Sequence, residues 1–124
     1  MVKLKRAYES PSEDDGNRYL VDRLWPRGIA KEDAQLSDWL KDVAPSEGLR
    51  KWFGHDPQRW GEFKRRYKLE LHAAAKEKIL MDLAQSAKAG DITLVFAAKD
   101  PEHNNAVVIK EILERKLETD DPST

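Results

Sequence analysis

The run ITLVFAA at residues 92–98 constrains the fold more than any other segment of the chain. It is apolar at consecutive positions, so both faces of a strand built from it have to be covered. A strand covered on both faces is typical of the centre of a parallel sheet with helices packed against it. The sequence therefore predicts an α/β fold with residues 92–98 as its central strand.

The rest of the chain supplies strands and helices in alternation. Residues 2–8 and 18–24 are predicted as strands, and apolar side chains three and four residues apart predict helices over 57–71, 79–87 and 101–117. This order favours a small, mainly parallel sheet flanked by helices. The link between the first two strands is short for a normal crossover helix, so an antiparallel pairing of these two strands stays open.

Two segments before residue 45 have weaker patterns. Residues 29–35 fit a short helix. The apolar side chains of residues 36–44 fall on one helical face, but Trp39, Lys41 and Val43 also alternate as they would in a strand. Both interpretations stay open, and we favour the strand.

Capping residues mark where the helices begin and end. Ser46 is a good N-cap, and Gly54 can end the following helix in a left-handed turn. Asp56 and Pro57 then combine a cap with a proline suited to the first helical position. Gly90 ends the helix over 79–87.

The length of 124 residues predicts a single α/β domain over residues 1–117, followed by a frayed polar tail over residues 118–124. The 22 basic and 23 acidic residues give a net charge of −1, which argues against nucleic-acid binding by bulk charge. The chain has no cysteine, so disulfides, thiolate metal sites and thiol nucleophiles are excluded.

The N-terminus is charged and lacks the apolar run of a signal peptide. The longest apolar run, residues 94–98, is far too short to cross a membrane. We therefore expect a cytoplasmic protein without a membrane partner.

Polar side chains gather where two predicted strands end. The strand at 18–24 leads into the charged and aromatic segment 22–27, and the strand at 92–98 leads into residues 99–105. In open parallel sheets, ligands bind beyond the carboxyl ends of the strands. We therefore expect these two segments to meet at one rim of the sheet and to form a site there.

Residue types at this rim fit an anionic ligand. Arginine binds phosphate or carboxylate in a bidentate manner, and the first turn of the last helix, where His103 is expected, favours anions. The ligand-binding candidates are Arg23, Arg27, Trp25, Lys99, Asn104 and Tyr67. The alternative is that the arginines only form ion pairs and that the side chains near His103 only cap the helix.

Three side chains are candidates for proton transfer: Asp22, His103 and His55. A carboxyl group inside an apolar strand needs a partner, and a histidine changes charge near neutral pH. Asp22 could equally form an ion pair with a nearby cation, and His55 could be an ordinary loop residue. Asp56 is explained as a helix cap.

Other kinds of site have weak support. No paired-histidine or cysteine motif indicates a metal site, and no glycine-rich phosphate loop is present, so the sequence leaves the cofactor unknown. Lys64, Arg65 and Arg66 form a basic run that is typical of a solvated helix face. The alternative is a basic patch that these residues form together with Arg50, Lys51 and Arg59. Nucleic acid is therefore an unlikely partner, although nearby tryptophans would suit base stacking.

Several motifs together resemble a known family. They are LVDRLWPRG at residues 20–28, WLKDVAPS at 39–46, LRKWFGHDPQRW at 49–60, F-x-x-R-Y at 63–67 and AKDPEHNNA at 98–106. The sequences of these motifs and their order along the chain resemble the YeaO-like branch of the domain-of-unknown-function 488 family over nearly the whole chain. This resemblance implies a Rossmann-like three-layer arrangement and a strand within residues 36–43.

The resemblance implies no reaction. Other branches of the family carry a cysteine and a glutamate at the end of the last strand, where this chain has Phe96 and Ala98, so thiol chemistry is not carried over. They also carry a Cys-His-Arg motif at the last helix, where this chain has residues 103–105. An Asp-Arg pair after the second strand does match, at Asp22 and Arg23.

Two functions follow as hypotheses. The first is a domain that binds a small anionic molecule, such as a nucleotide or phosphorylated metabolite, at the rim, with or without acid–base catalysis. The second is a non-catalytic interaction or regulatory module that binds protein or nucleic acid through Trp25 and Trp52. A single concave pocket lined by the rim cations would favour the first. The sequence leaves the oligomeric state open.

Overall fold

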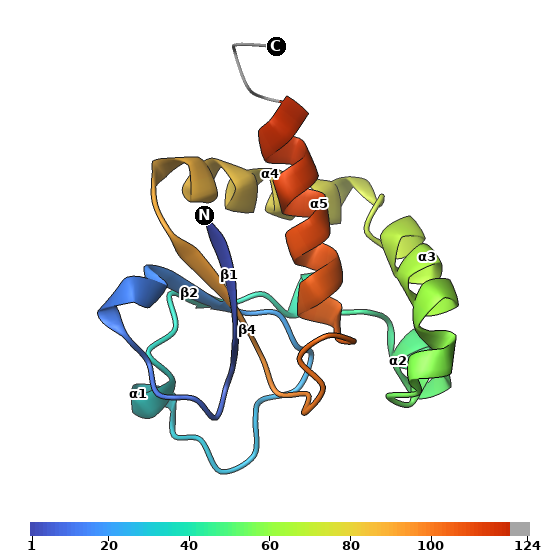
Figure 1. Cartoon of the computed structure of the whole chain (residues 1–124), viewed down its shortest axis with the longest axis horizontal. Helices are drawn as coiled ribbons and strands as arrows, with labels where there is room; N and C mark the ends of the chain where they lie inside the picture. The colour runs from blue at the N-terminus through green and yellow to red at the C-terminus, as the bar shows by residue number, and fades with distance from the viewer. Residues whose placement is uncertain (120–124) are drawn as a thin grey trace.

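The computed structural model describes residues 1–119 and shows an α/β fold, as predicted (Figure 1). Its four-stranded sheet has the order β1-β4-β2-β3, and all three strand pairs are parallel. The strands are β1 (Val2–Arg6), β2 (Asn17–Leu20), β3 (Asp38–Trp39) and β4 (Ile92–Phe96). All residues of β4 are buried, as expected for a central strand covered on both faces.

The central strand β4 separates the first two strands of the chain. Val2 of β1 and Asn17 of β2 both align with Ile92, on opposite sides of β4. The antiparallel pairing that the short link suggested is therefore wrong. The link between β1 and β2 crosses over β4 with only a 3₁₀ turn, η1 (Glu13–Asp15), instead of a long crossover helix.

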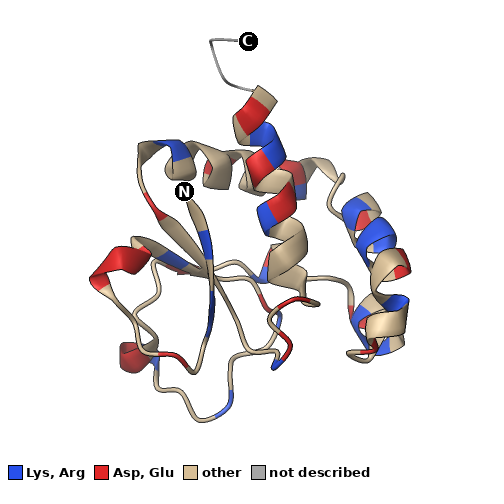
Figure 2. Cartoon of the chain, in the orientation of Figure 1, with Lys and Arg blue, Asp and Glu red and all other residues tan. Residues whose placement is uncertain are grey.

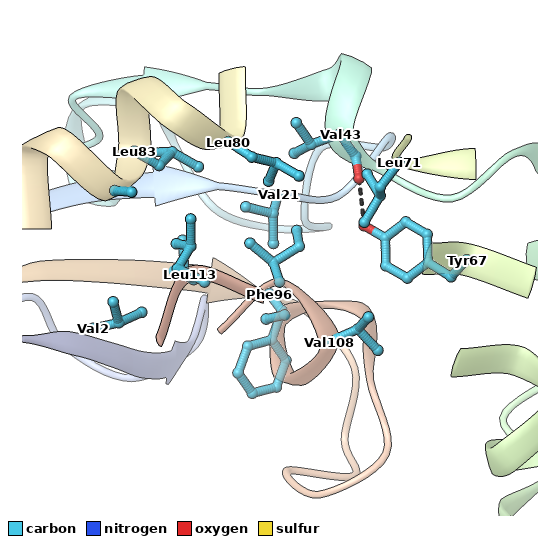
Figure 3. Packing of buried hydrophobic residues seen from close by; sticks show 14 of the residues in the cluster. Val2, Val21, Val43, Tyr67, Leu71, Leu80, Leu83, Phe96, Val108 and Leu113 are labelled. Carbon is cyan, nitrogen blue, oxygen red and sulfur yellow. Dashed lines mark hydrogen bonds between the residues drawn. The ribbon is translucent and has the colours of Figure 1, made fainter. Parts of the chain in front are cut away.

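One face of the sheet is covered by the long helices α4 (Ala74–Ala89) and α5 (Asn105–Thr119). Leu80 and Leu113 from these helices share one hydrophobic core with Val2 and Phe96 of the sheet (Figure 3). Helices α2 (Glu47–Phe53) and α3 (Trp60–Glu70) extend this core beyond the sheet, and Figure 1 shows them to one side of α5.

The other face of the sheet is covered by shorter elements. These are η1 and the single-turn helix α1 (Lys31–Ala34), which lies within the segment predicted as a short helix. Below them, the buried side chain of Arg18 bonds to Asp15, which Lys5 also contacts. The three layers are therefore a helical layer, the parallel sheet and a layer of turns, in the predicted Rossmann-like arrangement.

Several boundaries differ from the prediction. Strand β2 ends at Leu20. The amide of Val21 still donates to the carbonyl oxygen of Val95 of β4 at 3.1 Å, and the chain then turns away from the sheet. The segment 36–44 contains the favoured strand as β3, but it is short and is followed by a 3₁₀ turn, η2 (Lys41–Val43).

The last helix begins later than predicted. The carboxylate of Asp100 accepts hydrogen bonds from the amides of Glu102 and His103, at 2.9 and 3.2 Å, and holds these residues in a turn. Asn104 then caps α5 by accepting the amide of Val107 at 3.2 Å. The prediction that His103 and Asn104 lie in the first helical turn is therefore wrong, because both precede the helix.

The predicted helix caps are confirmed elsewhere. Ser46 accepts the amide of Leu49 at the start of α2, and Gly54 ends α2 with a φ of 52°. Helix α5 ends at Thr119, and residues 120–124 of the predicted tail lie outside the described residues. Within residues 1–119, no helix combines the length and the apolar character that crossing a membrane requires.

Candidate functional site

A cavity of about 630 Å³ lies at the carboxyl ends of β2 and β4. Its walls include residues 22–27, which follow β2, and residues 97–100 and 103–105, which follow β4. Parallel strands end at the same edge, so two segments far apart in the sequence meet there. The candidates that line the cavity are Asp22, Arg23, Trp25, Arg27, His55, Lys99, His103 and Asn104.

Asp22 joins the two segments. One oxygen of its carboxylate, Oδ2, accepts a hydrogen bond from the amide of Ala97 at 2.8 Å, just beyond the end of β4. Its backbone carbonyl accepts a hydrogen bond from the indole nitrogen of Trp39 at 2.7 Å. Asn105 adds a second link by donating its amide hydrogen to the carbonyl oxygen of Val21 at 2.8 Å. The rim is therefore a fixed wall.

The pKa of Asp22 is raised above its ordinary value. Burial disfavours the charged carboxylate and is the main cause. Hydrogen bonds from the amide of Ala97 and the side chain of Asn105, with the nearby His55, stabilise the charge but offset the effect only in part. Asp22 is thus a partly desolvated acid in the wall of a cavity, which is the kind of carboxyl group that functional sites often contain.

Cations surround the mouth of this cavity. Arg23, Arg27, Arg50 and Lys99 all line it, and all four side chains are exposed. Arg23 makes only a long bond of 3.4 Å to the carbonyl oxygen of Pro45. Among residues 1–119, no acidic side chain pairs with any of the four. By contrast, four other arginines of the chain are held by carboxylates: Arg18, Arg59, Arg65 and Arg66.

Aromatic side chains form much of the remaining wall. The indole nitrogen of Trp25 donates to the carbonyl oxygen of Ile29 at 2.7 Å, and its ring packs edge-on against Trp39 at 5.3 Å between centroids. Phe53 and Phe63 stack on each other with centroids 4.3 Å apart and are both buried. Trp25 is therefore held in one orientation at the cavity, and the phenylalanines form an apolar floor.

His103 is held in place by Asp100. Its Nδ1 lies 2.8 Å from an oxygen of the Asp100 carboxylate, and its ring meets Trp60 edge-on with centroids 5.3 Å apart. Hydrogen bonds to the Asp100 carboxylate, first from the amide of Glu102 and then from His103, lower the pKa of Asp100. The second ring nitrogen, Nε2, makes no hydrogen bond within residues 1–119.

The remaining candidates occupy different surroundings. Asn104 is buried, and it uses its amide group to bond Asp100 and to cap α5. His55 is exposed and has a positive φ of 59°, which follows from the tight turn after α2. Tyr67 does not line the cavity: it is fully buried in the core and donates its hydroxyl to the carbonyl oxygen of Val43 (Figure 3).

The structure adds wall residues that the sequence reasoning did not select. The sequence interpretation places Arg50 only in a basic patch with the run on α3, although its position three residues before the buried Phe53 places both on one side of α2. Tyr8 follows β1, so the same rule that selected the ends of β2 and β4 also applies to it. Asn105 stands next to the selected Asn104.

A family model described as the inactive DUF488-N3 subclade matches residues 1–124, the whole chain. The chain belongs to the DUF488 family. This DUF488 chain is 42% identical to the uncharacterized protein Rv3073c of Mycobacterium tuberculosis (strain ATCC 25618 / H37Rv), over 90% of the chain and 92% of that protein. It is 40% identical to the uncharacterized protein YeaO of Escherichia coli (strain K12), over 90% of the chain and 96% of YeaO. No solved structure matches it.

The groups that a metal site or a basic nucleic-acid surface would use are arranged differently in this DUF488 chain. Within residues 1–119, no three histidine or acidic side chains come together as a metal site would require. The basic run on α3 is visible in Figure 2, but Arg65 and Arg66 both bond to Glu62, and Lys64 bonds to Glu111 at 3.0 Å. Its charges are therefore largely paired within the protein.

Replacing Asp22 with asparagine is expected to change how stability depends on pH. The raised pKa means that the folded protein holds this proton more tightly than the unfolded chain, whose value is near 3.8. As the pH rises from about 3.8 through the folded pKa, the wild type loses stability that the variant keeps. In urea titrations from about pH 3 to pH 7, the free energy of unfolding of the variant minus that of the wild type should increase as the pH rises.

The matched control for this prediction is Asp82→Asn. Asp82 is exposed on α4, and its side chain makes no hydrogen bond or ion pair within residues 1–119. Because Asp82 is exposed, its variant measures the effect of losing one carboxylate charge without the effect of burial. If the Asp22 variant behaves like this control, the idea that burial destabilises the charged Asp22 is wrong.

Proposed function

We propose that the protein binds a small anionic molecule in the cavity at the rim of the sheet. The observation that carries this proposal is the meeting of Arg23, Arg27, Arg50 and Lys99 around one cavity without carboxylate partners. Arginine that is not committed to an ion pair can bind phosphate or carboxylate through two parallel hydrogen bonds. Four cations facing two lining carboxylates, Asp22 and Asp100, favour an anion over a cation.

The size and make-up of the cavity also support a small ligand. A volume of about 630 Å³ falls within the range of pockets that hold small molecules. Such pockets combine an apolar lining with a few convergent polar groups, as this one does. Trp25 lies in the cavity wall, which favours this function over an interaction module that presents Trp25 on a flat surface.

We propose binding without turnover as the form of this function. The description of the matching family model as an inactive subclade favours it. The geometry is compatible with it as well, because Asp22 holds the end of β4 through Ala97 and His103 is bonded to Asp100. In this role Asp22 and His103 position the wall and contact the ligand, rather than moving protons through a reaction.

Removing two of the cations is expected to weaken binding by about a hundredfold or more. The double variant Arg27→Ala with Arg50→Ala loses charge-assisted hydrogen bonds, each worth roughly 1.5–3 kcal/mol, and about 1.4 kcal/mol changes affinity tenfold. Titration calorimetry with ribose 5-phosphate as the probe measures the loss. Both side chains are exposed, so circular dichroism and the melting temperature should show an intact fold.

The matched control is Arg115→Ala. Arg115 is an exposed arginine of α5 outside this cavity, and it too makes no ion pair within residues 1–119. Its removal takes one positive charge from the protein, against two in the double variant, and should leave the affinity for ribose 5-phosphate within about twofold, since only long-range electrostatics change. Equal losses in the two variants would reduce the proposal to nonspecific charge attraction.

A further inference from the structure

We propose that the ligand is a phosphate monoester joined to a flat heteroaromatic ring, the chemistry of a nucleoside monophosphate. This inference rests on the proposed function and narrows the class of anion that the rim cavity takes. It follows from the way charge, depth and aromatic groups are distributed over the walls of the cavity. Each of these points to one part of the ligand.

The cationic side chains of the cavity are exposed, and the phenylalanine side chains that line it are buried. The cations Arg23, Arg27, Arg50 and Lys99 are exposed, whereas Phe53 and Phe63 retain only 5% and 2% of their surface. An anionic group is therefore bound at the mouth, where its cations stay hydrated enough to be charged. The body of the ligand enters the apolar interior.

The charged group at the mouth fits a phosphate monoester. The walls carry four cationic side chains and two carboxylates, and one of these carboxylates, Asp100, is already bonded to His103. An excess of two positive charges matches a dianion better than a monoanion. Three of the cations are arginines, whose planar forks match the oxygens of a phosphate group.

The interior fits a flat ring rather than an aliphatic chain. Trp25 is fixed by its bond to Ile29 and its contact with Trp39, so it presents a rigid surface for stacking at little entropic cost. Asp22, Asn105 and His103 also place polar groups on the walls. A heteroaromatic ring can hydrogen-bond these groups through its edge. An aliphatic chain would bury the same groups without replacing the hydrogen bonds that they make to water.

Titration calorimetry at one fixed salt concentration tests this inference with AMP, GMP, CMP and UMP. Adenosine supplies the ring without phosphate, and ribose 5-phosphate supplies the phosphate without the ring. At least one nucleoside monophosphate should bind about tenfold or more tighter than either fragment, since joining the two parts adds their contacts without a second loss of freedom. A 5′-phosphorylated trinucleotide shows whether the cavity takes a free nucleotide or the phosphorylated end of a strand.

Variants of Trp25 separate the ring from the phosphate. Trp25→Leu should lower the affinity for the preferred nucleotide about tenfold, the scale of one lost stacking contact, and leave ribose 5-phosphate within about twofold. Trp25→Phe keeps a flat ring and should retain most of the nucleotide affinity, which guards against a folding defect. Trp52→Leu is the matched tryptophan control, because Trp52 does not line this cavity.

The failures of the two proposals are distinguishable. If ribose 5-phosphate binds as tightly as every nucleotide, the claim that the cavity recognises a heteroaromatic ring is wrong, and the proposed anion site still stands. Adenosine binding as tightly as AMP would overturn both the phosphate and the proposed function. Binding of neither the nucleotides nor ribose 5-phosphate would overturn the two proposals together.

Discussion

Replacing Arg18 with alanine is expected to lower the free energy of unfolding by about 3–5 kcal/mol, because removing the closest partner of a buried carboxylate leaves its charge poorly compensated. Arg18 retains 4% of its surface and Asp15 retains 6%. The Arg18 guanidinium donates to Asp15 at 2.7 Å and to the carbonyl oxygen of Ala34 at 3.1 Å. The change therefore also removes the partner of a backbone carbonyl.

The neighbours of Asp15 show why this loss is not easily repaired. Burial alone would raise the pKa of Asp15, but hydrogen bonds from the Ser12 amide, Lys5 and Arg18 lower it overall. The charge is thus maintained by its partners. Without Arg18, Asp15 keeps Lys5 at 3.1 and 3.2 Å and the amide of Ser12 at 3.0 Å, but the link to the carbonyl oxygen of Ala34 near α1 is lost.

Urea unfolding followed by circular dichroism measures this effect. The control is Arg65→Ala, which breaks an exposed ion pair with Glu62 and should cost at most about 1 kcal/mol. A cost for Arg18→Ala as small as that of the control would show that the polar cluster on this face of the sheet contributes little to stability.

Replacing Gly16 with alanine is expected to lower the free energy of unfolding by about 2–5 kcal/mol, from a strained backbone and an overpacked contact together. Gly16 has a φ of 63° and a ψ of −141°, a conformation essentially restricted to glycine. A Cβ atom built there would lie 2.0 Å from the carbonyl oxygen of Asp91. That oxygen belongs to the backbone before β4 and accepts the amide of Asn17, so it cannot move freely.

Two glycine controls separate these causes. Gly28 has a φ of 78°, and no atom lies within 4 Å of a Cβ built there. Gly28→Ala should therefore lower the free energy of unfolding only through backbone strain, by roughly 1–2 kcal/mol. Gly48 lies inside α2 with open space around it, and Gly48→Ala should stabilise the protein by roughly 0.5–1 kcal/mol. Thermal unfolding of the three variants should follow this order, and a Gly16 variant no worse than the Gly28 variant would remove the contact with Asp91 from the explanation.

The cavity at the rim of the sheet is the candidate site of this DUF488 protein, whose lack of cysteine excludes thiol chemistry there. Asp22 and Asn105 tie the ends of β2 and β4 together, and this bracing holds the wall that carries Arg23 and Arg27. A wall fixed before binding lowers the entropic cost of recognising a ligand. The proposed binding function therefore depends on the same contacts that close the sheet at this edge.

Much of the candidate site was predictable because it depends on where strands end. Once strands are known to be parallel, their carboxyl ends share one edge, and this brings residues 22–27 and 99–105 together. Arg50 and Tyr8 were not predicted, since their presence depends on how α2 and the chain after β1 lie over the edge. Tyr67 was assigned to the rim, but packing against the Val43 segment places it in the core.

The sequence by itself determined the local features and the fold class: the doubly buried strand β4, the cap at Ser46, the left-handed end at Gly54 and a mainly parallel α/β sheet. These follow from backbone preferences and apolar periodicity, which act over a few residues. Only the tertiary structure decided that β4 lies between β1 and β2, that Asp15 of an acidic loop is buried, and where α5 begins. These features depend on contacts between residues far apart in the chain, such as the bond of Thr93 to the carbonyl oxygen of Asp15, which no local pattern records.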